Sequence, residues 1–358
     1  MKAIFDELRH THTFLVDTKK LVGINSRVEQ LKSHLAIGSN DVRIVGIWGI
    51  GGMGKTTLAR VVYNMVSNQF EARGFIDDVR VNNEKYGLPW LQKELLKNLL
   101  ICKDIDEKDV NDIDLMFENR LRHKKILLVL DDVNDSKQLD KLVGSPDWFG
   151  LGSRVIITTR EEHLLETHEV NAKYEVKALN NDEALQLFSL KAFKKDRPFV
   201  EYEELSQTFL HYSQGLPLAL ETLGSLLFNR SIEEWKNKLY SLKDFPEERI
   251  LDVLKISFNG LQALEREIFL NIACFFNYMY QDDAIEILDC LQLYSTFGLR
   301  VLAGKSLIKM DYKILWMHEL LQEMGRDVVR QECFQDPGKR SRLWLYKDID
   351  AVLTKNTV

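Results

Sequence analysis

The segment Gly49–Thr57 constrains the fold more than any other part of the chain. It reads GIGGMGKTT and matches the spacing G-x-x-x-x-G-K-[ST]. Glycines at these positions let the backbone curl so that several N–H groups converge on phosphate oxygens. The apolar run Val42–Trp48 precedes the segment, and Thr56–Val66 follows it with helical spacing. A strand, a glycine-rich loop and a helix in this order predict a P-loop within an α/β domain.

Each polar residue of the loop has an expected role. Lys55 is expected to reach the β- and γ-phosphates of a nucleotide, and the Thr56 hydroxyl is expected to ligate Mg²⁺. The positive end of the following helix would point at the phosphates. The residues of this loop expected to bind nucleotide are Gly49, Gly51, Gly52, Met53, Gly54, Lys55, Thr56 and Thr57.

Two acidic residues follow a second apolar run. Asp131 and Asp132 come directly after Ile126–Leu130. Taken alone, two acids after a strand also fit an ordinary turn. The P-loop upstream favours a site, because a parallel sheet brings its strand ends to one edge. We expect Asp131 to hold Mg²⁺, directly or through water, and Asp132 to orient or activate the attacking water. The catalytic candidates are Asp132, Lys55 and Asp131.

A third apolar run, Val155–Thr159, ends at Arg160. At the carboxyl edge of the sheet, this guanidinium would touch a γ-phosphate and report whether it is present. An ordinary surface arginine is the alternative interpretation. The two neighbouring phosphate-site elements favour the first interpretation.

Strands and helical segments alternate in the first half of the chain. The apolar runs are nearly continuous, which suits a parallel sheet covered on both faces. Trp90–Leu100 and Ile113–Arg122 have helical spacing. After Leu179 the strand signals fade, and helical spacing recurs in Asp182–Phe193, Tyr202–Ser213 and Leu218–Leu227. These patterns predict an α/β domain followed by a helical domain.

The segment after Ile250 combines helices with a hairpin. Ser306–Met310 and Ile314–Met317 are apolar pieces separated by Asp311–Lys313. Helices followed by a small hairpin predict a winged-helix domain. The expected divisions are a leader or linker at 1–20, a nucleotide-binding P-loop domain at 21–178, a helical domain at 179–249, and a winged-helix domain with a C-terminal extension at 250–358.

Charge and hydropathy argue against several classes of protein. The formal net charge is −6, which argues against nucleic-acid or membrane-surface binding driven by bulk charge. No apolar run reaches the length of a membrane span, and the first residues do not form a secretory signal. The cysteines are scattered without C-x-x-C spacing, as in a cytosolic protein with reduced thiols. The basic run Lys339–Arg342 is expected to be a solvated surface or a contact for another domain.

The P-loop is followed in order by five further motifs: LDDV (Leu130–Val133), GSRVIITTR (Gly152–Arg160), GLPLAL (Gly215–Leu220), FLNIACFF (Phe269–Phe276) and MHELLQEMG (Met317–Gly325). This order resembles the NB-ARC module of plant nucleotide-binding, leucine-rich-repeat immune receptors. FLNIACFF and the valine of LDDV resemble the branch that carries a TIR domain. The resemblance covers roughly Leu21 to Leu345 and implies that the helical and winged-helix domains are ARC1 and ARC2.

The resemblance also implies roles for four residues outside the P-loop. In this family an LVG-x-x-x-R segment lies against the adenine and ribose, and here it contains Val22 and Arg27. Pro217 is implied to press on the nucleotide, and His318 to contact the β-phosphate of ADP. Three of the four also have a plain alternative: core packing for Val22, a helix start for Pro217, and an ordinary core or surface histidine for His318.

Two positions depart from the family pattern. Glu319 follows the histidine where Asp is usual, and Asn271 stands in FLNIACFF where Asp is commoner. Glu319 keeps the charge of the usual aspartate but is one methylene longer, which bears on the tightness of the resting state. No TIR signature precedes Leu21 and no leucine-rich repeat follows Leu345, so we expect neither NAD cleavage nor ligand sensing from these residues.

The resemblance implies an ADP/ATP switch of an intracellular plant receptor that acts in defence signalling. ADP would hold it off, ATP would drive opening and self-association, and slow hydrolysis would reset it. TIR and leucine-rich-repeat domains are expected in a full-length relative. We expect a cytoplasmic location, with the nucleus as the alternative. The alternative functions are a motor- or kinase-type P-loop ATPase and a scaffold that binds nucleotide without hydrolysing it.

Overall fold

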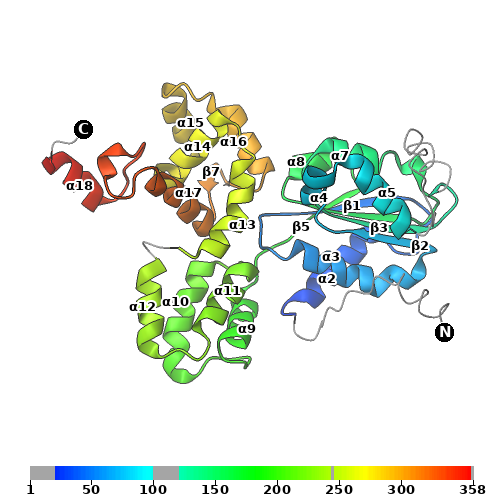
Figure 1. The fold of residues 1–358 in the computed structure, drawn as a ribbon, viewed down its shortest axis with the longest axis horizontal. Coiled ribbons are helices and arrows are strands. Elements are labelled where there is room, and N and C mark those ends of the chain that lie inside the picture. The colour runs from blue at the N-terminus through cyan, green and yellow to red at the C-terminus, as the bar shows by residue number, and fades with distance from the viewer. Residues whose placement is uncertain (1–20, 100–120, 243–245, 356–358) are drawn as a thin grey trace. The chain divides into compact units, whose positions relative to one another are not determined.

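The computed structural model describes residues 21–99, 121–242 and 246–355 (Figure 1). The described chain divides into two compact units. The first contains the residues up to Gly49 and Gly54–Lys177, and the second contains Ile50–Met53 and the residues from Ala178 onward.

The first unit is built on a parallel sheet of five strands in the order β2-β3-β4-β1-β5. The strands are β1 (Arg43–Trp48), β2 (Ala72–Ile76), β3 (Ile126–Val133), β4 (Arg154–Thr159) and β5 (Ala172–Glu175). The three strands predicted from apolar runs are confirmed as the three central strands of this sheet. The predicted α/β P-loop class is confirmed with them.

The two edge strands were not predicted. β2 reads ARGFI and includes Arg73 and Gly74, while β5 reads AKYE and is only four residues long. Most of β2 is buried, but Arg73 and Gly74 interrupt its apolar sequence, whereas β5 has only one buried residue. The apolar pattern of each strand is therefore too weak to identify it from the sequence.

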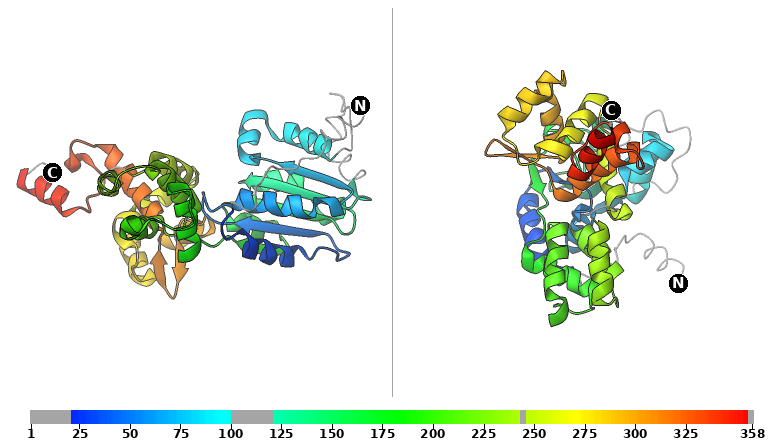
Figure 2. Two further views of the ribbon diagram at one scale, coloured as in Figure 1. Left: turned by 90° about the horizontal axis from the view of Figure 1, so that it is seen from below. Right: turned by 90° about the vertical axis from the view of Figure 1, so that its left-hand side faces the viewer.

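Helices cover both faces of this sheet (Figure 1 and the left view of Figure 2). One face packs on α2 (Ile24–Leu35) and α3 (Lys55–Val66), and the other is covered by α4 (Val79–Tyr86), α5 (Leu88–Asn98), α7 (Ser136–Leu142) and α8 (Glu162–Thr167). Alternate strand residues such as Leu128, Leu130 and Ile157 join the core on the second face. The predicted helix at Trp90–Leu100 is confirmed as α5, whereas most of Ile113–Arg122 lies outside the described residues.

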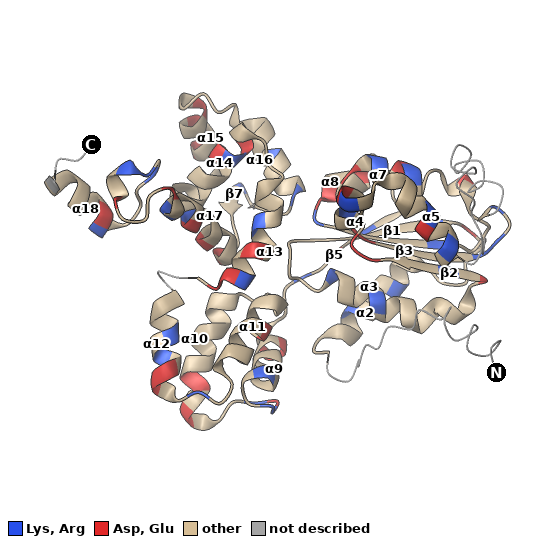
Figure 3. Ribbon diagram, viewed as in Figure 1, with Lys and Arg blue, Asp and Glu red and all other residues tan. Residues whose placement is uncertain are grey.

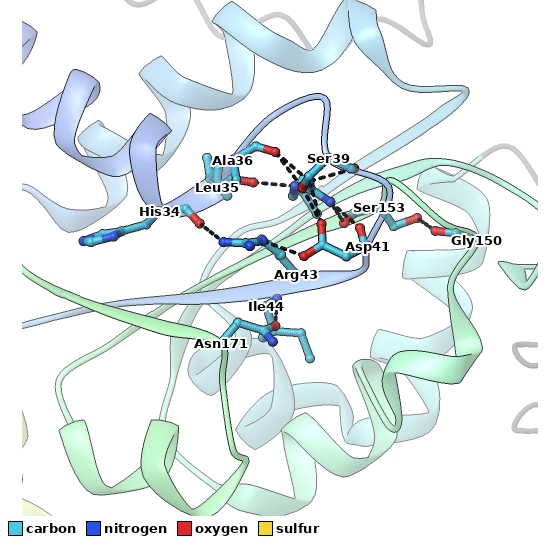
Figure 4. A network of polar contacts seen from close by, with 11 residues as sticks. His34, Leu35, Ala36, Ser39, Asp41, Arg43, Ile44, Gly150, Ser153 and Asn171 are labelled. Atoms are coloured by element: carbon cyan, nitrogen blue, oxygen red, sulfur yellow. Dashed lines mark hydrogen bonds and ion pairs between the residues drawn. The ribbon is translucent and has the colours of Figure 1, made fainter.

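Arg154, the first residue of β4, is fully buried and holds the connection between α2 and β1. Its guanidinium donates to the carbonyl oxygens of Leu35, Ala36 and Asp41 and to the hydroxyl of Ser39. Figure 4 shows these acceptors gathered around one point. The first two carbonyls lie at the negative end of α2, which suits a buried cation. This network secures the amino-terminal ends of β1 and β4.

The second unit begins with a helical bundle. Its helices are α9 (Asn181–Ala192), α10 (Glu203–Ser213), α11 (Pro217–Leu227) and α12 (Ile232–Leu242). Trp235 is fully buried, lies with its ring centroid 5.7 Å from that of Phe188, and donates from its indole N–H to the Leu227 carbonyl at 3.1 Å. The helices predicted in this region are confirmed as α9, α10 and α11.

A winged-helix arrangement follows in the same unit. It contains α13 (Glu248–Asn259), α14 (Ala263–Asn271), a π-helical turn (Ile272–Phe276), α15 (Gln281–Cys290), α16 (Ser295–Gly304), the hairpin β6 (Lys309–Asp311) and β7 (Ile314–Trp316), and α17 (Glu319–Glu332). α18 (Tyr346–Lys355) closes the described chain. Short 3₁₀ turns occupy Ser67–Gln69, Pro146–Trp148, Val200–Tyr202 and Pro337–Lys339. The predicted hairpin and winged helix are confirmed.

The basic run after α17 is only partly the solvated surface that the sequence predicts, because Lys339 and Ser341 are exposed whereas the side chains of its two arginines are buried. Arg342 is buried, donates from Nε to Asn271 at 3.0 Å and pairs with Glu267 at 2.6 Å. Arg340 pairs with Asp348 at 2.9 Å. These partners lie outside the run in sequence, so the local charge pattern cannot show that its arginines are buried. The Asn271 amide, a departure from the family pattern, has a defined partner here.

Charges of both signs are mixed on the outer helices. Figure 3 shows acidic and basic residues interspersed along α12 and α17. None of the described helices combines the length and apolar character needed to cross a membrane.

Candidate nucleotide-binding site

The P-loop connects β1 to α3, as the sequence predicts. Gly54 ends it with φ +88°, and nothing lies within 4 Å of a Cβ built there, so backbone conformation alone requires glycine at this position. Gly52 also has a positive φ of +80°, and a Cβ there would meet the Leu218 Cβ at 2.8 Å. Gly52 therefore meets two requirements, one conformational and one steric.

Lys55 is the first residue of α3 and is only 8% exposed. Its Nζ donates to the Gly49 carbonyl at 2.7 Å, so the side chain reaches back across the loop. Burial and the nearby Arg160 together lower the pKa of Lys55 to about 7, against the opposing effect of Asp132 and Asp131. An anion at this point would stabilise the ammonium form.

Asp131 lies at the same sheet edge and is 2% exposed. Its Oδ1 accepts from the Thr56 hydroxyl at 2.8 Å and from the Thr158 hydroxyl at 2.6 Å. Burial raises the pKa of Asp131, and the two hydroxyl donors oppose that shift. The structure therefore brings together the two residues predicted to ligate Mg²⁺, Thr56 and Asp131.

One hydroxyl and one carboxylate fit the usual way in which Mg²⁺ is held beside phosphates. The ion takes one or two protein oxygens and completes its shell with phosphate oxygens and water. Among the described residues there is no group of three or more His, Cys, Asp or Glu side chains that would hold a metal without such help. The donor set suits an ion that arrives with a nucleotide.

Asp132 occupies an irregular position in β3. It has φ +57°, and the register with β4 shifts between Leu130 and Val133. Such a bulge turns a side chain away from the regular alternation. The Asp132 carboxylate lies 3.0 Å from Arg80 and 3.3 Å from Arg160, between two guanidinium groups. Its backbone N–H donates to the Thr158 hydroxyl at 2.9 Å.

Arg80 and Thr158 were missed in the sequence. Arg80 lies in α4, shortly after β2, and β2 itself was not recognised as a strand. A correct assignment of β2 would have placed the residues after it at the carboxyl edge of the sheet. Thr158 lies inside a predicted strand two residues before Arg160, where a hydroxyl at the carboxyl end of a strand is the available signal.

Val22 and Arg27 lie at the start of α2 in the first unit. Val22 is half-buried in the turn before this helix. Arg27 donates to the Gly23 carbonyl at 2.6 Å and to the Lys177 carbonyl at 3.4 Å. These bonds tie the start of α2 to the segment that follows β5.

Pro217 is the first residue of α11, the helix-start position expected for a proline. The preceding Gly215 has φ +71°, and a Cβ there would meet the Leu179 carbonyl oxygen at 2.3 Å. Leu218, which follows Pro217, donates from its backbone N–H to the Gly52 carbonyl at 3.2 Å. Within the second unit, the GLPLAL turn therefore contacts the P-loop segment Ile50–Met53.

His318 is 5% exposed and precedes α17. Its Nδ1 accepts from the Leu320 backbone N–H at 3.2 Å, so the imidazole caps this helix. Burial lowers the pKa of His318 to about 4, against the opposing effect of the Gln214 carbonyl. The ring is therefore neutral near pH 7 and carries its proton on Nε2. No described residue accepts from Nε2 with regular hydrogen-bond geometry.

Two known protein families match parts of the chain. Residues 24–197 match the NB-ARC domain, and residues 262–333 match the winged-helix domain of Roq1-like disease resistance proteins. Disease resistance protein RUN1 of Vitis rotundifolia is 42% identical over 93% of this chain, and TMV resistance protein N of Nicotiana glutinosa is 42% identical over 95%. The chain carries an NB-ARC domain followed by a Roq1-like winged-helix domain, and these relatives are plant disease resistance proteins. The resemblance inferred from the ordered motifs is thereby confirmed.

This NB-ARC chain spans only part of those relatives, 25% of RUN1 and 30% of the N protein. Two solved structures share its fold. The Walker-type ATPase PABY2304 of Pyrococcus abyssi is 14% identical with a TM-score of 0.60, over 85% of this chain and 96% of that one. The ORC2 protein of Aeropyrum pernix, solved as ADPNP–ADP complexes, is 12% identical with a TM-score of 0.52, over 90% and 97%.

Proposed function

We propose that this NB-ARC chain is the ADP/ATP switch of an intracellular plant immune receptor that acts in defence signalling. The observation that carries the proposal is the meeting of Lys55, Thr56 and Asp131 with the Asp132 carboxylate and its two arginines at one edge of the sheet. To bind a chain of phosphates and detect the γ-phosphate, a site needs a cation, a pair of oxygens that ligate Mg²⁺, and a carboxylate held by arginines.

The P-loop binds the phosphates in this proposal. Lys55 exchanges the Gly49 carbonyl for β- and γ-phosphate oxygens, and backbone N–H groups of Gly49–Thr57 complete the cradle. Thr56 and Asp131 hold Mg²⁺, which would neutralise charge on the phosphates when bound. Val22 and Arg27 lie against the adenine and ribose.

The γ-phosphate changes the pairing of Arg160. Because Arg160 shares Asp132 with Arg80, it is able to turn to a phosphate without leaving that carboxylate unpaired. Asp132 then has one free oxygen with which to orient the attacking water. The presence of the γ-phosphate and the ability of Asp132 to orient water are thus linked through the Arg160–Asp132 ion pair. We expect slow turnover, because a switch requires a long-lived ATP state.

Pro217 and His318 hold the resting state. Pro217 presses on the nucleotide from the start of α11, and His318 donates its Nε2 proton to a phosphate oxygen of ADP. A neutral donor makes a moderate bond that ATP-driven opening is able to break. The shift requires the open form to bind ATP better than ADP. Opening then permits self-association.

The context of the switch follows from the family. TIR and leucine-rich-repeat domains belong to the full-length receptors of the TIR-bearing branch, and NAD cleavage is assigned to the TIR domain and not to these residues. The protein acts in the cytoplasm, with the nucleus as the alternative compartment. No nucleic-acid partner is proposed.

Two other functions remain as alternatives. A motor- or kinase-type ATPase predicts rapid multiple turnover, and a scaffold predicts nucleotide binding without any hydrolysis. Single-turnover and steady-state ATP hydrolysis by the purified monomer separate the three. We expect complete but slow single turnover. Rapid steady-state turnover would favour the motor-type enzyme, and no hydrolysis after prolonged incubation would favour the scaffold.

A further inference from the structure

The turn that carries His318 is held on both sides by amide side chains outside the recognised motif. Asn277, just after the π-helical turn, faces Met317 with both ends of its amide. Its Nδ2 donates to the Met317 carbonyl at 3.1 Å, and its Oδ1 accepts from the Met317 N–H at 2.8 Å. Both the N–H and the carbonyl of Met317, the residue immediately before His318, are thereby hydrogen-bonded to one side chain.

Asn277 extends a strand-like pairing that begins on the hairpin. Tyr278 donates from its backbone N–H to the Leu315 carbonyl at 2.9 Å, and Leu315 donates to the Met279 carbonyl at 2.9 Å. The Asn277 side chain continues this ladder, while its own backbone N–H donates to the Ile272 carbonyl at 3.1 Å. The position of Met317 is therefore set by β7 and by the segment after the π-helical turn together.

Gln214 holds the residue on the other side of His318. Its Oε1 accepts from the Glu319 backbone N–H at 3.2 Å. Gln214 ends α10 with φ +45°, and it directly precedes the GLPLAL turn. Four residues after Gln214, the Leu218 backbone N–H donates to the Gly52 carbonyl. A short stretch of chain therefore contacts the P-loop through its backbone and the His318 turn through one side chain.

We infer that Asn277 and Gln214 are positioning residues for the His318 imidazole, and that Gln214 couples the GLPLAL turn to it. Asn277 sets the backbone before the ring, and Gln214 sets the backbone after it. With Nδ1 engaged by Leu320, the remaining Nε2–H has one direction in which to point. Both bonds use uncharged amides, so they hold the turn without changing the charge that an approaching phosphate meets. This inference rests on the proposed function of His318 as a phosphate contact.

The test measures release of a fluorescent ADP analogue from the full chain. We expect Gln214→Ala to speed release about three- to tenfold and Asn277→Ala, which loses two bonds, about ten- to thirtyfold. Gln214→Glu and Asn277→Asp keep an acceptor for the backbone N–H and should fall between the wild type and the alanine variants. Gln331→Ala, which changes an exposed amide three turns along α17, is the matched control and should leave release unchanged.

The decisive comparison repeats these changes in a His318→Ala background. If the amides act through the ring, Gln214→Ala and Asn277→Ala add little further acceleration there, because coupled residues are not additive. Full additivity would overturn the inference and leave the proposed function standing. If His318→Ala itself leaves ADP release unchanged, the phosphate contact fails, and the inference fails with it.

A spectroscopic readout separates positioning from a general loss of stability. In the wild type the His318 ring should titrate near pH 4, as its burial requires. In Asn277→Ala its titration midpoint should move upward, toward the ordinary value of about 6.5, as water reaches the loosened turn. An unchanged His318 titration in a folded variant that releases ADP faster would contradict the positioning role.

Discussion

At the amino-terminal ends of β1 and β4, Arg154 is fully buried and donates mostly to backbone carbonyls. At the carboxyl edge of the same sheet, Arg80 and Arg160 share the carboxylate of Asp132. Arg154 bonds to Leu35, Ala36, Ser39 and Asp41, and every one of these acceptors belongs to the α2–β1 connection. Arg80 and Arg160 retain side-chain exposures of 18% and 16% beside Asp132.

The difference separates a structural arginine from an exchangeable one. Removing Arg154 would leave buried carbonyls without donors, and each such group is costly. Removing Arg160 would leave Asp132 paired with Arg80 and in reach of water. One end of the sheet is therefore fixed by its hydrogen bonds, and the other is able to change partners when phosphate arrives.

The largest expected effect comes from removing Arg154, whose hydrogen bonds fix the amino-terminal end of the sheet. Arg154→Met should lower the free energy of unfolding by about 3–5 kcal/mol, the range for a buried charged group removed from its partners. Arg160→Met, the matched change at the other end, should cost less than about 1 kcal/mol. Urea denaturation of both variants makes the comparison. Equal losses of unfolding free energy in the two variants would show that Arg154 and Arg160 do not differ in their structural roles.

Lys55 should affect binding strongly and folding little. Lys55→Ala removes a charged donor to phosphate and should weaken ADP binding on the order of a hundredfold. Lys55→Arg keeps the charge and should retain a larger share of the affinity. Calorimetric titration with ADP measures both. Wild-type affinity in Lys55→Ala would place the phosphates elsewhere.

The low pKa of Lys55 predicts a pH dependence of binding. Below about pH 7 the free protein already carries the ammonium, whereas above it a proton must be taken up when phosphate binds. ADP affinity should therefore fall as pH rises from 7 to 9, by at most about tenfold per unit for one proton. Lys55→Arg stays charged and should show no such fall, which also corrects for titration of ADP itself. Parallel profiles for the two proteins would contradict the assignment.

The smallest effect should come from the shared carboxylate. Arg160→Met should reduce ATP affinity by about three- to tenfold and leave ADP affinity nearly unchanged, because only ATP has the γ-phosphate. Arg80→Met tests whether the second arginine matters mainly by holding Asp132, and it should slow single-turnover hydrolysis more than it weakens binding. Equal losses of ADP and ATP affinity in Arg160→Met would remove its sensing role.

The central strands and the P-loop could be predicted because their signals are local. Ile126–Leu130 and Val155–Thr159 are buried on both faces, so their apolar character is continuous. β2 and β5 are edge strands and lack that continuity, and Arg80 was missed along with β2. Thr56 and Asp131 were expected together because a parallel sheet brings the carboxyl end of β1, which leads into the P-loop, and that of β3 to one edge.

Other features depend on partners distant in sequence. Arg342 looks solvated in the run Lys339–Arg342, yet it is buried against Glu267 and Asn271. Asn277 and Gln214 have no motif of their own, and their bonds to Met317 and Glu319 form only after the hairpin and helices pack. Pairings of this kind arise from tertiary structure, so local periodicity does not encode them.

The most direct test of the switch is the identity of the nucleotide that the protein carries. The chain would be purified without added nucleotide and denatured gently, and the released nucleotide would be identified and quantified by chromatography. The account predicts near-stoichiometric ADP, with Glu319 serving in place of the usual aspartate. ATP, or an empty site, would contradict the ADP-held resting state and leave only the P-loop and its family in place.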